Sequence, residues 1–144
     1  MGDLSRNFSR KEFACNCASV GKLPSEGYCG GKRDAVDAEL LNVLQQMVDD
    51  FESYSMHRVS VTITSGNRCE KHNADEGGAK DSQHLLAKAA DVKLFYLGGA
   101  QIPSDEVYAY LDKKYHDRYG VGRYRNRTHI DVRRNVSRWE KLEG

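Results

Sequence analysis

The chain has 144 residues, of which 39% are hydrophobic and 30% are charged, and its formal net charge is +1. This length and composition are typical of one globular domain with one core. The balanced charge excludes the strongly basic composition that marks many nucleic-acid-binding proteins. No apolar run approaches the ~20 residues of a membrane span, so we expect neither nucleic acid nor a membrane as a partner.

An irregular arm is predicted for residues 1–33, because this stretch contains Pro24 and several glycines. Phe8 and Phe13 are expected to pin the arm to the core. The start of the chain lacks the charged-then-apolar layout of a signal peptide. We therefore expect a protein that is made and kept in a cytoplasm, or released by another route.

Four cysteines occur, Cys15, Cys17, Cys29 and Cys69. In a cytoplasmic chain, thiols are more often reduced or metal-bound than paired in disulfides. Together the four residues can in principle hold a structural zinc ion, but their spacing is not that of a standard zinc knuckle. We therefore expect buried thiols that pack the arm, and no second, structural metal ion.

The next elements follow from periodicity. From Asp37 to about Tyr54, apolar residues recur at helical spacing and predict the strongest helix. Residues 59–64 alternate between apolar and polar side chains, which predicts a half-buried strand. Residues 66–83 are polar and predict a long loop, a kind of segment that often carries function.

The second half of the chain predicts a strand from Ala89 to about Tyr96 and a helix that opens at Pro103. Acidic residues in the first turn of that helix and lysines in its last turn suit the helix dipole. Residues 119–124 and 128–132 predict two short strands with a tight connection. The order of elements predicts an α+β fold, a single domain over residues 1–144 with a small antiparallel sheet flanked by helices.

Two histidines and an aspartate are candidate metal ligands. Asp91 follows His84 by seven residues at an expected loop-to-strand bend, and His129 lies on another expected strand. Two imidazoles and a carboxylate suit a catalytic zinc ion with one open position, which activates water for hydrolysis. Spacing alone does not exclude that these three residues occur together in the sequence by chance. Asp131 shares a strand face with His129, so it is either a partner of that ligand or an acid/base of the site.

Two segments carry the most specific motifs. Residues 82–91 resemble the SxHxxGxAxD motif of the M15 zinc metallopeptidases, the family of D-Ala-D-Ala carboxypeptidases and peptidoglycan endopeptidases. Residues 128–133 resemble the strand that carries the last histidine ligand in that family. The resemblance implies the zinc fold that hedgehog domains share. It also implies one zinc ion bound by His84, Asp91 and His129, with water in the fourth position.

Two further segments occur in the order that the family shows. Residues 64–73 resemble its SGxRxxxxN segment, and residues 120–124 resemble the GVGxY strand before the last ligand. The resemblance runs from about Phe8 to Arg133. It extends to the small phage-type members, which often begin with an FSxxEFxC segment like residues 8–15 here.

The resemblance also implies roles for two polar residues. Arg68 matches the family arginine that holds the substrate carbonyl or carboxylate, where a guanidinium can stabilise an oxyanion. A surface salt bridge is the alternative role for Arg68. Ser82 matches the motif serine and is a candidate for substrate binding, although a loop cap explains it equally well.

Some positions depart from the family pattern. Ala87 replaces the motif glycine, which we expect to shift the bend slightly. Asn126 and Arg127 stand where several relatives carry an acid or a histidine, so no motif assigns the general base. Asp131 is the first candidate for the base because of its face and reach. The next candidates are the acids of the long loop, Glu70, Asp75, Glu76 and Asp81, whereas His72 in that loop is expected to face solvent.

The resemblance therefore implies a zinc peptidase that hydrolyses the peptide stems of bacterial peptidoglycan. We expect a monomeric phage endolysin that acts on the cell wall after release from the host cytoplasm, or a virion-associated protein with the same chemistry. L-Ala-D-Glu endopeptidase and D-Ala-D-Ala carboxypeptidase activities both remain open. The alternative, motivated by Asn126 and Arg127, is a non-catalytic zinc-containing domain of the same fold that binds the cell wall or serves in the virion.

Overall fold

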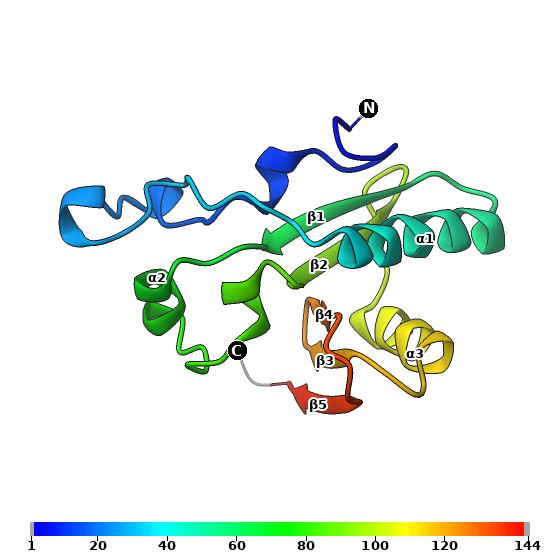
Figure 1. Ribbon diagram of the computed structural model, residues 1–144. Coiled ribbons are helices and arrows are strands. Elements are labelled where there is room, and N and C mark those ends of the chain that lie inside the picture. Colours follow the sequence, from blue (N-terminus) through cyan, green and yellow to red (C-terminus); the bar gives the residue numbers. More distant parts are fainter. Residues whose placement is uncertain (1, 143–144) are drawn as a thin grey trace.

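Five strands form one open sheet in the computed structural model of the protein, which describes residues 2–142 (Figure 1). The strands are β1 (Val59–Ser65), β2 (Ala89–Tyr96), β3 (Gly120–Tyr124), β4 (Thr128–Asp131) and β5 (Ser137–Lys141). Their order is β1-β2-β4-β3-β5; the first three neighbouring pairs are antiparallel, and β3 and β5 are parallel. The predicted α+β fold is confirmed, and a parallel fifth strand extends its small antiparallel sheet.

Three α-helices accompany the sheet, α1 (Ala38–Ser55), α2 (Glu70–Asp75) and α3 (Ser104–Lys114). Helix α1 begins where the Asp37 carboxylate accepts the backbone N–H groups of Glu39 and Leu40, which otherwise lack partners at a helix start. Phe51 of α1 packs against Tyr110 of α3 with ring centroids 5.1 Å apart, so both helices contribute to one core. Within residues 2–142, no helix has the length and apolar character that a membrane crossing requires.

Most predicted elements are present in the structure. The helix predicted from Asp37 to about Tyr54 is α1, and the strand predicted from Ala89 to about Tyr96 is β2. The prediction of a loop over residues 66–83 is partly wrong, because α2 lies within it. This helix has only six residues, most of them polar. It is too short to show a periodic apolar face, so its sequence pattern does not reveal it.

The N-terminal arm is irregular, as predicted, and it is fixed to the core at two aromatic side chains. Phe8 and Phe13 are 0% and 1% exposed. The backbone N–H of Asn67, just after β1, donates to the carbonyl of Phe13 at 2.8 Å. A side chain at Gly66 would come within 2.8 Å of the Phe13 backbone, so glycine permits this close approach. The arm then runs out beside α2, as Figure 1 shows in blue.

Candidate metal centre

Three predicted ligands converge at the middle of the sheet. Asp91 on β2 and His129 on β4 are direct partners in the antiparallel register. His84 lies in the 3-10 turn Gln83–Leu86, just before β2. One ligand atom from each residue lies within 4.8 Å of the other two, and all three residues are buried. The structure thus brings together the residues that the sequence singles out.

Each imidazole in this cluster presents one nitrogen to Asp91 and is held through the other. His84 Nε2 lies 3.5 Å from Asp91 Oδ2, and its Nδ1 lies 2.7 Å from the carbonyl oxygen of Gly66. His129 Nδ1 lies 2.9 Å from Asp91 Oδ1, and its Nε2 lies 2.7 Å from Asp131 Oδ2. Metal-bound histidines are commonly held through the second nitrogen in this way. Two imidazole nitrogens and one carboxylate are donors that zinc takes, so these residues fit that ion.

Neighbouring histidines and an arginine stabilise the ionised form of both carboxylates in the cluster. Burial raises the pKa of Asp91, but hydrogen bonds with His129 and His84 hold the pKa well below its ordinary value. Burial also raises the pKa of Asp131, and contacts with His129 and Arg133 again hold the pKa low. Burial lowers the pKa of His129, whereas Asp131 and Asp91 raise it, and the net shift is upward. Both carboxylates are therefore ionised at neutral pH, the form in which a carboxylate binds metal.

Asp131 lies on the side of the His129 ring that faces away from Asp91. Its side chain is 0% exposed, and it accepts hydrogen bonds from Arg133 Nε at 2.8 Å and Nη2 at 2.7 Å. The backbone N–H of Gly120 donates to the same carboxylate at 3.2 Å. Of the two roles that the sequence leaves open for Asp131, these contacts favour a partner that orients His129.

Two glycines of β3 make room for the groups that surround His129. A side chain at Gly120 would collide with the Asp131 carboxylate. Gly122 pairs with His129 across the sheet, and a side chain there would collide with Trp139. The Trp139 ring packs against the His129 ring with centroids 5.0 Å apart. Trp139 reaches this place beside His129 because β5 pairs in parallel with β3.

The Arg68 side chain is largely buried beside the candidate ligands. It therefore does not form the surface salt bridge that the sequence leaves open as an alternative. Its side chain is 13% exposed, and its Nη2 lies 3.5 Å from Asp91 Oδ2. Its Nε donates to Ser65 Oγ at 2.9 Å, and its Nη1 donates to Asn73 Oδ1 at 3.2 Å. The side chain of Ser82 accepts the backbone N–H of His84 at 3.2 Å, which makes it a cap of the ligand turn. Both Arg68 and Ser82 also line the cavity at the site.

The ligand turn ends at Ala87, the position of the motif glycine. Ala87 has a φ of 61°, in the left-handed region that glycine adopts at lower cost. Its carbonyl accepts the backbone N–H of Asp37 at 2.9 Å, and Lys88 N–H donates to the carbonyl of Gln83. The bend toward Asp91 therefore forms with alanine, at the cost of a strained backbone.

A cavity of about 500 Å³ opens on the three ligands. Its charged lining is mainly positive and contains Arg68, Arg127, Arg133 and Lys141, against the acids Glu76 and Asp91. The Arg127 guanidinium lies 4.1 Å from the centre of the Tyr124 ring, which also lines the cavity. Such a cavity favours a substrate with negative charge.

The four acids of the predicted loop differ in their access to this cavity. Glu76, whose side chain is 54% exposed, lines the cavity, whereas Glu70, Asp75 and Asp81 do not. The expectation that His72 faces solvent is wrong, because α2 buries it to 3% exposure. His72 Nε2 lies 3.4 Å from Glu76 Oε1. The histidine thus contacts the one acid of this group that lines the cavity.

Comparison with known proteins gives one match. The family model described as Peptidase M15 matches residues 6–131, a range that includes the candidate ligands and Arg68. Neither a curated protein nor a solved structure is similar enough to the chain to count as a match. Members of the matched family are zinc-dependent peptidases, and two buried imidazoles beside a carboxylate fit that dependence. Because the match spans most of its length, the chain belongs to the Peptidase M15 family.

Proposed function

We propose that the protein is a zinc-dependent peptidase that hydrolyses the peptide stems of bacterial peptidoglycan. The observation that carries this proposal is the convergence of His84, Asp91 and His129 within 4.8 Å, beside a guanidinium held by Ser65 and Asn73. Nε2 of one imidazole, Nδ1 of the other and the carboxylate would hold the ion. An ion bound there would supply a Lewis acid for the scissile carbonyl and a means of activating water near neutral pH.

Arg68 is the group that stabilises the oxyanion of the scissile carbonyl. Hydrogen bonds with Ser65 and Asn73 fix its guanidinium before substrate arrives. A preorganised donor stabilises developing charge without reorganising during the reaction. A guanidinium has five N–H donors, so further N–H groups remain for a substrate oxygen.

Glu76 is our candidate for the general base. Glu76 is a lining residue of the cavity, and its side chain is 54% exposed. Asp131, the first candidate from sequence, is enclosed by His129, Arg133 and Gly120. We therefore assign proton transfer to Glu76 and the positioning of His129 to Asp131.

The positive cavity supports a substrate with a free carboxylate near the scissile bond. In a peptidoglycan stem, both the L-Ala–D-Glu and the D-Ala–D-Ala bonds have a free carboxylate on the residue after the bond. Arg127, fixed over Tyr124, and Lys141 are available for such a group. We propose a phage endolysin as the setting, since the start of the chain resembles those of small phage-type relatives.

Digestion of purified peptidoglycan tests this proposal. Release of amino groups that stops with a chelator and returns with zinc supports a peptidase, and His84→Ala serves as the inactive control. Mass spectrometry of defined stem peptides identifies the bond that is cut.

Because Asn126 and Arg127 replace the usual acid or histidine, the alternative is a wall-binding domain. Zinc-loaded protein that sediments with cell walls but releases no amino groups establishes that alternative.

A further inference from the structure

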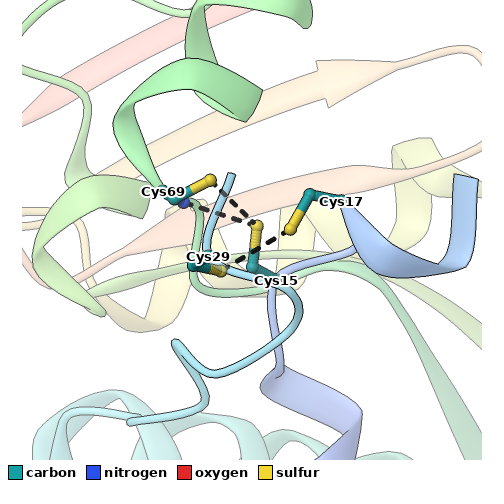
Figure 2. Close-up of side chains that lie close together, drawn as sticks. All are labelled: Cys15, Cys17, Cys29 and Cys69. Atoms are coloured by element: carbon teal, nitrogen blue, oxygen red, sulfur yellow. Dashed lines mark hydrogen bonds between the residues drawn. The ribbon is translucent and has the colours of Figure 1, made fainter. Parts of the chain in front are cut away.

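Four cysteines from separate segments converge where the arm meets α2 (Figure 2). Cys15 follows the 3-10 turn Arg10–Phe13, and Cys17 directly precedes the turn Ala18–Val20. Cys29 follows the turn Pro24–Glu26, and Cys69 directly precedes α2. All four sulfur atoms lie within 4.8 Å of one another. The side chains point toward a common centre in Figure 2.

The distances between these sulfurs match tetrahedral coordination of a metal ion. Cys15 Sγ and Cys69 Sγ are 3.8 Å apart, and Cys17 Sγ and Cys29 Sγ are 3.6 Å apart. Zinc–sulfur bonds of about 2.3 Å in a regular tetrahedron place the sulfurs about 3.8 Å from each other. A disulfide bond would need about 2.05 Å, and all four cysteines are free.

The arm around these cysteines has almost no other core. Between residues 14 and 33, the buried side chains are Cys15, Cys17 and Tyr28. Val20 and Leu23, the large aliphatic residues of this stretch, are 59% and 54% exposed. So little apolar burial does not offset the entropy of ordering such a segment. Small segments of this kind commonly require a metal ion or disulfides to fold.

The surroundings also suit a cluster of thiolates. The backbone N–H of Cys69 donates to Cys15 Sγ at 3.4 Å. Lys22 and Lys71 lie 5.8 Å and 4.8 Å from the centre of the Tyr28 ring, which packs against the cysteines. Four thiolates around Zn²⁺ leave an excess of negative charge, which nearby lysines offset.

We propose that Cys15, Cys17, Cys29 and Cys69 bind a second zinc ion with a structural role. Four thiolates complete the tetrahedron and leave no position for water, so this site is not catalytic. The sequence leads us to expect thiols that only pack the arm, because spacing does not show how the arm folds back. The four ligands come from separate turns and from the start of α2, and they do not have the spacing of a zinc knuckle.

This site also fixes the segment that presents Arg68, a consequence that rests on the proposed role of that arginine. Cys69 directly follows Arg68, and Asn73 of α2 holds the Arg68 guanidinium. Arg33 from the arm donates to the Arg68 carbonyl at 3.0 Å. Loss of the structural ion would therefore disturb Arg68 as well as the arm.

Metal analysis separates the two sites. We expect wild-type protein to hold one zinc ion per site, His84→Ala to keep only the cysteine-bound ion, and Cys17→Ser in that background to hold none. Cobalt added to metal-free His84→Ala protein should show the intense near-ultraviolet bands of thiolate-to-cobalt charge transfer. A His84→Ala protein without bound metal, or cobalt spectra without thiolate bands, would overturn the proposal whatever the protein does to peptidoglycan.

A second measurement uses unmodified protein, because Cys17→Ser can prevent folding. In zinc-loaded wild type, alkylating reagents should leave the four thiols intact until a strong chelator removes the metal. Val20→Ser, an exposed substitution in the same arm, is the matched control and should keep both ions. Rapid alkylation of all four thiols in zinc-loaded protein, or two disulfides in protein purified without air, would contradict a structural zinc site.

Discussion

The His129–Asp131 pair gives the first prediction at the scale of single residues. Asp131→Asn keeps the size of the side chain but removes the charge that faces His129 Nε2 and Arg133. Since partners of metal-bound histidines contribute about 10- to 100-fold to activity or metal affinity, we expect kcat to fall by that factor. Zinc should remain bound when metal is in excess. Wild-type kcat in Asp131→Asn, with zinc content measured alongside, would exclude this role.

Glu76 gives a second prediction of this kind. Glu76→Gln removes a proton acceptor from the cavity lining, so we expect kcat to fall about 10²- to 10⁴-fold. Zinc content and melting temperature should stay close to those of wild type. Glu70→Gln is the matched control, because Glu70 is exposed on α2 and does not line the cavity. Equal kcat in both variants would place the base elsewhere.

Ala87 provides a prediction about stability. Its φ of 61° lies in the left-handed region, which costs an L-residue about 1–2 kcal/mol. Ala87→Gly removes this strain but adds backbone entropy to the unfolded chain, so we expect a net gain of about 0.5–1 kcal/mol. Urea unfolding measures the change. Ala89→Gly, in the buried strand β2, should instead destabilise, and a loss in both variants would refute strain at Ala87.

At the scale of elements, a polar contact joins α1 to α3. The Asp50 carboxylate accepts Tyr110 Oη at 2.5 Å and Lys114 Nζ at 3.1 Å. Burial raises the pKa of Asp50, but these partners and Gln46 bring it below the ordinary value of 3.8. Because the pKa of Asp50 is lower in the folded protein than in the unfolded chain, the contact stabilises the fold at neutral pH. Its contribution is lost as pH falls from the unfolded-state pKa through the folded-state pKa.

We therefore expect Asp50→Asn to lower the free energy of unfolding by about 1–2 kcal/mol at pH 7. The difference from wild type should shrink near pH 3, because Asp50 then takes up a proton in the unfolded state and begins to do so in the folded state. Urea unfolding at both pH values measures the change. Asp117→Asn, at a carboxylate that is 62% exposed, should have little effect at either pH. A penalty for Asp50→Asn that is the same at both values would contradict the contact.

The elements that sequence predicts best are those with long, local patterns. Helix α1 has an apolar stripe over 18 residues and a capping aspartate, so pattern and end signals agree. Strand β2 is a nearly continuous buried run. In contrast, β5 is half-buried or exposed, without apolar alternation. Its parallel pairing with β3 depends on the path of the chain, which no local pattern encodes.

At the scale of the whole molecule, the same reasoning explains which parts of the sites are predictable. His84 and Asp91 lie in one short motif, and His129 lies in a second, so the sequence identifies all three. The four cysteines span the arm and the start of α2, and only the folded arm brings them together. The family match covers residues 6–131. One domain over residues 1–144, a monomeric state and a phage setting stay predictions.

Charge distribution gives the last prediction. The formal net charge is only +1, yet four cations line the cavity, so attraction of carboxylates is a local property of this face. Salt screens such attraction over about 8–10 Å at physiological ionic strength, and kcat/KM should fall as salt rises.

Arg127→Ala should lower kcat/KM about 5- to 10-fold, mainly through KM, and weaken its salt dependence. Arg125→Ala, exposed on the same turn and outside the lining, should leave both unchanged. An Arg127→Ala enzyme with undiminished salt dependence would show that this guanidinium does not attract the substrate.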